Sequence, residues 1–283
     1  MKIIQLLKQD LHCVFRSPKV MIVLLLTVFF LMDFSRDLRG MCELYQTGVS
    51  PYIYIVYLTT WRGRLFITLL MLILVSDAPF YNGSEIFLAV RVSKYQWLAG
   101  KFLLIAALSA IYQIVLMIIS VLVFLPYVGI SSQWGDIIEM YLEQSENMIT
   151  ADGITNMGNL LENSPVKVMF MQFILMVLFG ILVGMCILIL NGIFRNSVGT
   201  VLLGIIVSAD AYMTDLNFYI PMPELMTILP SSWLNPCDFF GTSGMSFGKS
   251  CLYMTIMIVL LILVSIAVTK KNYLSVAEGG SKK

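Results

Sequence analysis

VKVMFMQFILMVLFGILVGMCILILN, residues 166–191, is an apolar run that only Lys167, Gln172 and the closing Asn191 interrupt. A transmembrane helix needs about 20 apolar residues to cross a hydrocarbon core about 30 Å thick. The strands of a membrane β-barrel are shorter and alternate apolar with polar residues, and this run does not alternate. It therefore predicts a membrane-spanning α-helix in an all-α integral membrane protein.

The composition of the whole chain supports this class. Hydrophobic residues make up 59% of the 283 residues and charged residues 12%, whereas a soluble domain carries about a quarter of charged residues. Six spans are predicted, at residues 20–34, 63–79, 101–127, 166–191, 197–214 and 250–270. The first is short, because its unbroken apolar run from Val20 to Met32 covers only about 20 Å, and we expect protein to shield its outer end. PYIYIVYLTTW, residues 51–61, is a re-entrant segment, an interfacial segment or an extension of the second span.

Residues 1–18 predict an N-terminal interfacial amphipathic helix. The apolar residues Ile3, Ile4, Leu7, Leu11, Val14 and Phe15 recur at helical spacing, opposite Lys2, Lys8, Gln9, His12 and Arg16. No cleavable secretory signal is evident before the first span. With six spans and the N-terminus inside, 12 of the 18 Lys and Arg are cytoplasmic and 13 of the 17 acids are outside. The positive-inside rule thus predicts a multi-pass protein of the cell membrane with both termini in the cytoplasm.

The chain is predicted to form one transmembrane domain, residues 1–283, with two notable outer segments. Residues 128–165 form an acidic outer loop, in which WGDIIEMYLEQ predicts a short amphipathic helix on the membrane surface. Its acidity either attracts a cationic substrate or reflects the general scarcity of Lys and Arg in translocated loops, and the second interpretation is favoured. Residues 215–249 are interrupted by prolines, which predicts a helix-broken, re-entrant outer segment before the last span.

The sequence excludes several kinds of chemistry. One histidine and no clustered ligands argue against a metal site. We find no catalytic motif and no phosphate-binding loop, so the chain does not hydrolyse ATP by itself, carries no cofactor of its own and has no predicted nucleic-acid partner. Free thiols are favoured over a Cys42–Cys237 disulfide. The spacing of Gly180 and Gly184 permits close helix packing.

Asp210 lies near the outer end of the fifth predicted span. An acid at membrane depth is costly unless it is paired, so it marks an intramembrane ion pair or a substrate pathway. The ion pair is favoured, because Arg36, Arg39, Arg62 and Arg64 are all predicted outside and break the positive-inside pattern.

The stretch SDAPFYNGSEIFLAVRVSKYQWLAGK, residues 76–101, gathers charge and aromatic residues between two apolar runs. Ser84 predicts the N-cap of a short helix. An amphipathic turn is expected next, with basic side chains at Arg91, Lys94 and Lys101. Its aromatic residues Tyr95 and Trp97 would anchor it at the membrane interface. The pattern predicts a cytoplasmic docking element.

This stretch resembles the connection between the second and third spans of ABC-2 type transporter permeases. The matching residues are Glu85, Arg91, Ser93, Lys94, Trp97, Gly100 and Lys101. The resemblance extends over nearly the full chain, because the layout is also similar. It consists of an N-terminal interfacial helix, six spans, a short FRNS loop and a broken outer segment. Val92 stands where that family often has a proline, and the entry Asp77-Ala78-Pro79-Phe80 is unusual, which leaves the subfamily and the substrate open.

The resemblance implies a membrane subunit that works with a second permease chain and two separate ATPase subunits, which bind ATP and Mg. It implies that residues 80–101 act as a coupling region: Glu85, Arg91 and Lys94 would contact the ATPase, while Trp97 holds the element at the membrane. An exporter of amphiphilic peptides, lipids or drugs is then expected. The alternatives are a non-transporting partner that relays force or a signal from an ATPase to envelope machinery, and a membrane scaffold without an ATPase.

Overall fold

The computed structural model describes residues 2–79, 93–129, 131–149, 160–194, 197–219, 227–240 and 245–279. In chain order, its helices are α1 (Lys2–Phe15), α2 (Pro18–Phe34), α3 (Arg36–Tyr45), α4 (Ile53–Thr59), α5 (Trp61–Val75), α7 (Lys94–Val123), η1 (Leu125–Tyr127), α8 (Asp136–Ile149), α10 (Pro165–Phe194), α11 (Val198–Tyr219), η2 (Ser232–Leu234), η3 (Pro236–Asp238) and α13 (Phe247–Gly279). Apart from one isolated β-bridge between Val49 and Val128, this part of the chain is helical or irregular. The protein is an all-α membrane protein.

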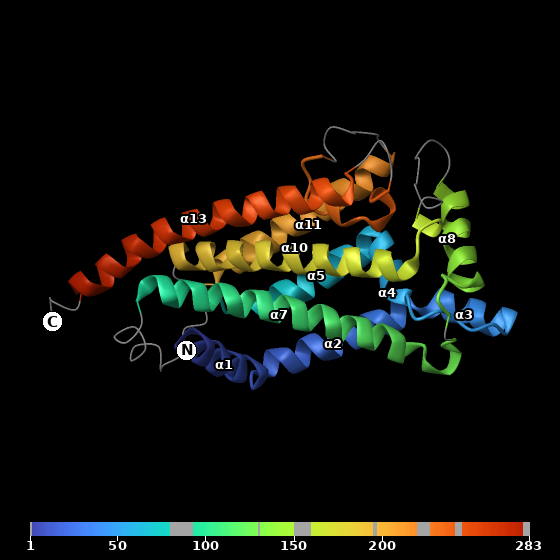
Figure 1. The fold of residues 1–283 in the computed structure, drawn as a ribbon, viewed down its shortest axis with the longest axis horizontal. Coiled ribbons are helices and arrows are strands. Elements are labelled where there is room, and N and C mark those ends of the chain that lie inside the picture. The colour runs from blue at the N-terminus through green and yellow to red at the C-terminus, as the bar shows by residue number, and fades with distance from the viewer. Residues whose placement is uncertain are drawn as a thin grey trace.

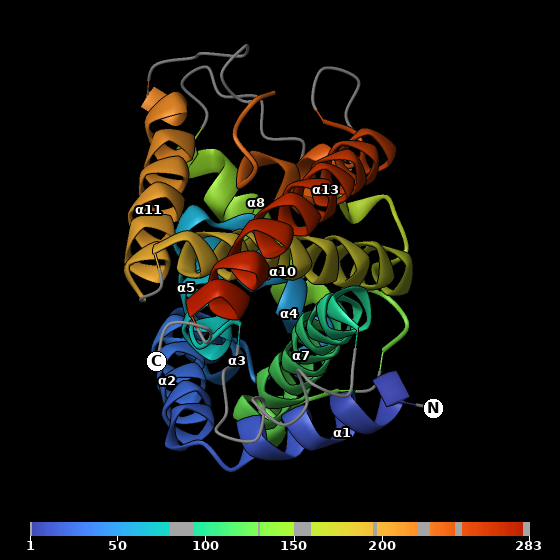
Figure 2. The same ribbon diagram turned by 90° about the vertical axis from the view of Figure 1, so that its left-hand side faces the viewer.

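The long helices run side by side as a bundle with two different ends (Figure 1). At the proximal end, α5 finishes, α7 begins and α13 finishes. At the distal end lie α3, α4 and α8. Figure 2 looks onto the proximal end and shows α1 lying across it beside α7.

Judged by their length and composition, the described helices can form three to five membrane spans. Three described helices are long and apolar enough to cross a bilayer, namely those at Tyr95–Val123, Pro165–Phe194 and Phe247–Val268. Two bent pairs each qualify when taken together: α1 with α2, at 63°, and α4 with α5, at 102°. Each of the six predicted ranges contains a helix, but the apolar part of α11, Val198–Thr214, is shorter than a full span.

Helix α10 is the centre of the bundle and packs against α5, α7, α11 and α13. In the most apolar 18-residue stretch of α10, 67% is buried inside the protein, whereas the corresponding share for α13 is 17%. A Cβ added at Gly180 would lie 2.7 Å from Ser109 Oγ, and one at Gly184 would lie 2.4 Å from Ile105 Cγ2. The predicted packing role of this glycine pair is confirmed, since both face α7 at a distance that a larger residue would not permit.

Helix α4 bears on the three interpretations of residues 51–61. Its residues from Ile53 to Leu58 are buried in protein, so this helix does not lie on the lipid-facing surface, and the 102° bend before α5 excludes a straight extension of the second span. The hydroxyl groups of two tyrosines find partners there: Tyr54 donates to Gln113 Oε1 at 2.9 Å, and Tyr57 lies 2.6 Å from Ser35 Oγ. Satisfied hydroxyl groups allow these large side chains to be buried.

Two segments at the distal end can be compared with the secondary structure expected from the sequence. The short helix expected within residues 134–144 is α8, which buries Ile137, Ile138 and Leu142. The indole of Trp134 donates to Asn163 O at 2.9 Å and holds the start of α8 near α10. Between α11 and α13, the described residues 227–240 form the 3-10 helices η2 and η3 and no α-helix, as expected for a helix-broken segment.

Candidate functional site

The start of α7 holds the described part of the predicted coupling region. Ser93 is the N-cap of α7: its Oγ accepts from Gln96 N, and Gln96 Oε1 accepts from Ser93 N, both at 3.4 Å. This reciprocal pair is a capping box, which fixes where the helix begins. Glu85, Arg91 and the side chain of Lys94 lie outside the described residues. The helix begins two turns before residue 101, where the sequence placed the start of the span.

Lys101 has a different position from the one expected of a docking residue. Its side chain is 0% exposed, and its Nζ donates to Asp10 Oδ2 of α1 at 2.9 Å. Asp10 is itself 3% exposed, and the Trp97 ring centroid lies 5.7 Å from Lys101 Nζ. Because α1 covers the charge of Lys101, any part of Lys101 in ATPase coupling would be indirect and would act through α1.

Sequence reasoning missed Asp10, although a signal was present. Asp10 lies three residues after Leu7 and four before Val14, so it shares the apolar face of α1. An acid on that face requires a buried cation, because burying an unpaired carboxylate is costly. The basic residues of the stretch 76–101 were the candidates for that cation.

A second ion pair joins the first span to the end of α5. Lys19, at the start of α2, donates to Asp77 Oδ1 and, at 3.2 Å, to Ser76 Oγ. This pair is open to solvent, with side chains 40% and 55% exposed. Nearby, Asn191 of α10 donates to Ser76 O at 3.1 Å and to Ala78 O at 2.8 Å. The end of α5 is thus attached both to α2 and to α10.

These contacts form a proximal frame, defined by the pairs Asp10–Lys101 and Lys19–Asp77 and by Asn191. The frame holds the two chain segments that flank residues 80–92: the end of α5 and the start of α7. Each flank is attached to the α1–α2 unit by an ion pair, one buried and one exposed. A force applied between the flanks would reach α1, α2, α5 and α7 together.

A second polar site lies near the distal end, where three helices meet residues 231–238. Arg64 of α5 is 4% exposed and donates from Nη1 to Leu58 O at 2.8 Å and to Thr59 O at 3.0 Å. These carbonyls end α4, and a cation at a helix C-terminus is favourable. Asp238 and, more weakly, Asp210 act electrostatically on the guanidinium. Arg64 therefore stabilises the sharp turn between α4 and α5.

Asp210 and Gln172 hold the backbone of residues 231–238 from two other helices. Asp210 Oδ2 accepts from Ser231 N, and Gln172 Nε2 donates to Leu234 O, both at 2.9 Å. Arg64 Nε, Asp210 Oδ1 and Gln172 Oε1 are buried and have no hydrogen-bond partner in the described residues. We refer to Arg64, Gln172, Asp210 and residues 231–238 as the distal polar cluster.

The four predicted arginine partners of Asp210 do not form a direct ion pair with it in the described part of the chain. Arg36 and Arg62 are exposed, and Arg62 lies over the Trp61 ring, 5.5 Å from its centroid. Arg39 donates to Val123 O at the end of α7. Arg64 alone of the four acts electrostatically on Asp210, and the main-chain N–H of Ser231 is its direct partner.

We expect double-mutant cycles to separate these arginines. The substitutions Asp210→Asn and Arg64→Gln should show an interaction energy of about 1 kcal/mol in the free energy of unfolding, since their charges share a buried environment. The pair Asp238→Asn and Arg64→Gln should show a larger interaction energy. Asp210→Asn with the exposed Arg62→Gln should be additive within about 0.3 kcal/mol. An interaction of equal size for Arg62 would contradict the assignment to Arg64.

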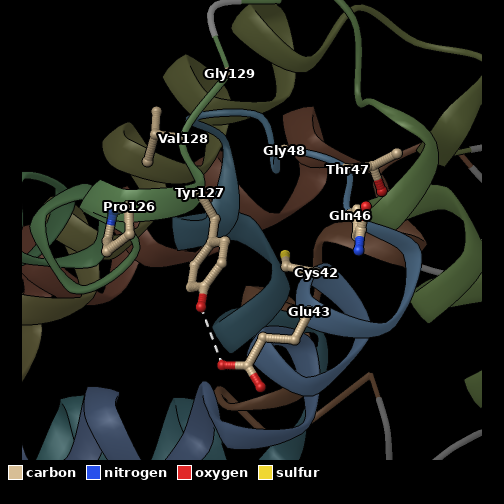
Figure 3. A pocket seen from close by; sticks show the side chains of 9 residues that line it. All are labelled: Cys42, Glu43, Gln46, Thr47, Gly48, Pro126, Tyr127, Val128 and Gly129. Atoms are coloured by element: carbon tan, nitrogen blue, oxygen red, sulfur yellow. Dashed lines mark hydrogen bonds between the residues drawn. The ribbon is translucent and has the colours of Figure 1, made fainter.

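An open pocket of about 470 Å³ lies at the distal end, between the end of α3 and the chain after α7. Figure 3 shows its lining, which is Cys42, Glu43, Gln46, Thr47, Gly48, Pro126, Tyr127, Val128 and Gly129. The Tyr127 hydroxyl donates to Glu43 Oε1 at 3.0 Å, and this hydrogen bond is the main cause that raises the pKa of Tyr127. Glu43 carries the one carboxylate among the residues that line this pocket, and Tyr127 is its hydrogen-bond partner.

All five cysteines lie in described residues, and none of them is part of a disulfide there. Cys42 and Cys237 are both buried, and no disulfide joins them. Burial raises the pKa of the Cys42 thiol, which makes it less reactive. Cys13, on the polar side of α1, is exposed. Within the described ranges, no three His, Cys, Asp or Glu residues gather in a way that could hold a metal ion.

Searches with this chain against protein-family models, curated proteins and solved structures find no match.

Proposed function

We propose that this protein is the membrane-spanning permease subunit of an ATP-driven exporter, in which separate ATPase subunits supply the energy and a second permease chain completes the pathway. The observation that carries the proposal is the proximal frame. The frame holds the two chain segments that flank residues 80–92, and that stretch of the sequence contains Glu85 and Arg91, which match the coupling connection of ABC-2 type permeases. A permease needs such a part, because its energy source is another protein.

The proposed mechanism is mechanical. An ATPase that binds residues 80–94 through Glu85, Arg91 and Lys94 would move the end of α5 and the start of α7. The buried Asp10–Lys101 pair ties α7 to α1, and Lys19–Asp77 ties α5 to α2. The helices would then tilt as one unit and carry an amphiphilic cargo outward. Trp97 is half-buried and lies beside Lys101, so it packs against the proximal frame.

The proposal places the proximal end in the cytoplasm of a cell whose plasma membrane holds the protein. Cys13 tests this placement without any substitution, because it is the one exposed cysteine of the five. We expect a membrane-impermeant maleimide to label inside-out vesicles at Cys13 and to leave intact cells unlabelled. A Cys13→Ser variant should lose the label. Labelling of intact cells at Cys13 would contradict the orientation.

The coupling role is tested by charge reversal. A variant with Glu85→Lys, Arg91→Glu and Lys94→Glu should no longer copurify with an ATP-binding protein, and it should lose ATP-dependent efflux, while its amount in the membrane is unchanged. Lys249→Glu, an exposed reversal at the distal start of α13, is the matched control and should keep both activities. A triple variant that retains its ATPase in full yield would overturn the proposal.

One observation favours the alternative of a non-transporting relay. At the distal end, α3 exposes Leu44 by 75% and Tyr45 by 49%, beside the acidic Glu43. Such residues suit contact with a partner outside the membrane. Copurification of an ATPase without any ATP-dependent efflux by the reconstituted complex would support this alternative. Absence of any ATPase partner would instead support a membrane scaffold.

A further inference from the structure

Helix α1 has three sectors around its axis. The inner sector packs on α7 and the core, with Leu7, Leu11 and Val14 half-buried and Asp10 fully buried. Asp10 is the one acid in α1, and Lys101 neutralises it. No acidic side chain of α1 is therefore left for its surface.

The second sector is an exposed apolar edge. Ile4 is 70% exposed and Phe15 is 50% exposed, and both lie on the same side of the helix next to the inner sector. α1 meets α2 at a bend of 63°, so it leaves the direction of the first span and crosses the proximal end (Figure 2). An apolar edge at that level suits the boundary between lipid headgroups and acyl chains.

The third sector is a basic row directly beside this edge. Lys8, His12 and Arg16 follow one another at intervals of four residues, so they align along one face. All three are exposed, and none has an acidic partner within the described residues. Lys8 and His12 also border an open depression of about 570 Å³ with Gln5 and Gln9, whose amides are additional donors.

We propose that the basic row Lys8, His12 and Arg16 binds the phosphate groups of anionic phospholipids in the leaflet at the proximal end. The apolar edge would set the depth of α1, and the row next to it would then lie at the level of the phosphates. Since Asp10 is turned inward, no carboxylate of α1 weakens the attraction. The same ion pair that fixes α1 on α7 thus leaves basic side chains and no acid on the exposed surface of α1. This site does not depend on the exporter function.

The test is the lipid preference of the full-length protein. Native mass spectrometry would compare the retention of phosphatidylglycerol and phosphatidylcholine with identical acyl chains, for the natural protein and for Lys8→Gln/Arg16→Gln. Each basic residue near an anionic surface strengthens binding about fivefold. We expect the preference for phosphatidylglycerol to fall about 20-fold in the double variant. The charge-conserving pair Lys8→Arg/Arg16→Lys should keep it.

Two controls make the result decisive. Lys249→Gln removes an exposed charge at the other end of the bundle and should leave the preference unchanged. Inorganic phosphate at millimolar concentration should not displace phosphatidylglycerol, because it lacks the acyl chains that the apolar edge contacts. An unchanged preference in Lys8→Gln/Arg16→Gln would overturn the proposal. An equal loss in Lys249→Gln, or displacement by free phosphate, would also overturn it.

Discussion

Lys101→Met is expected to lower the free energy of unfolding by about 3–5 kcal/mol, because it leaves the carboxylate of Asp10 buried without its cation. The two side chains are 0% and 3% exposed, so water cannot replace the lost partner. The loss should appear as a lower midpoint of unfolding in detergent, followed by circular dichroism. It should also loosen α1 from α7, since this pair is a buried polar link between them.

Two further variants separate the pair from its surroundings. Asp10→Leu/Lys101→Met should recover most of the stability lost in Lys101→Met, since no buried charge remains. Lys19→Met breaks the exposed pair with Asp77 and should cost at most about 1 kcal/mol. If the double variant were as unstable as the sum of its single variants, the pair would not be coupled as described.

Gly184→Val is the second substitution with a large expected effect. Its Cβ would lie 2.4 Å from Ile105 Cγ2 and 3.2 Å from Val75 Cγ1, so α10 must move away from both α7 and α5. Overpacking of this kind costs about 1–3 kcal/mol, and the branched side chain adds atoms beyond the Cβ. Because α10 is the central helix of the bundle, we also expect a lower yield of folded protein from the membrane.

The glycine of α11 supplies the control. A Cβ at Gly204 would have its nearest neighbour, Leu72 Cδ1, at 4.0 Å, so Gly204→Ala should be neutral or slightly stabilising. Ile105→Ala combined with Gly184→Ala should regain stability relative to Gly184→Ala alone, since the clashing methyl group is removed. Equal effects of alanine at positions 184 and 204 would show that close packing on α7 is not the cause.

The helices could be predicted from apolar run length, but the start of α7 could not. Lys94 and Lys101 looked like the charged border of a span, because charge is expelled from a bilayer core. In the structure Lys101 lies inside the protein, since Asp10, 91 positions earlier, supplies its counter-charge. Such a pairing depends on how α1 folds back onto α7, and a linear sequence does not contain that information directly.

The sequence drew attention to two residues of the distal polar cluster without showing how they are bound. The cost of an acid at membrane depth pointed to Asp210, and the position of the outer arginines pointed to a set that includes Arg64. The sequence could not show that Ser231 N is the partner of Asp210, because any residue has a main-chain N–H. It likewise missed Gln172, whose polar side chain is hidden in the most apolar run and holds Leu234 O.

The lengths of the spans have a consequence for the bilayer around the protein. Helix α2 has 17 residues, about 26 Å at helical rise, and the apolar part of α11 is no longer, while α7 and α10 have 30 residues each. Both short helices pack on α5, so they share one side of the molecule (Figure 2). A hydrocarbon layer about 30 Å thick exceeds them by about 4 Å. If α2 and α11 each cross the bilayer, as the six-span prediction has them, the lipids beside α2, α5 and α11 would have to thin to match the protein, and the two leaflets would come closest together along that side.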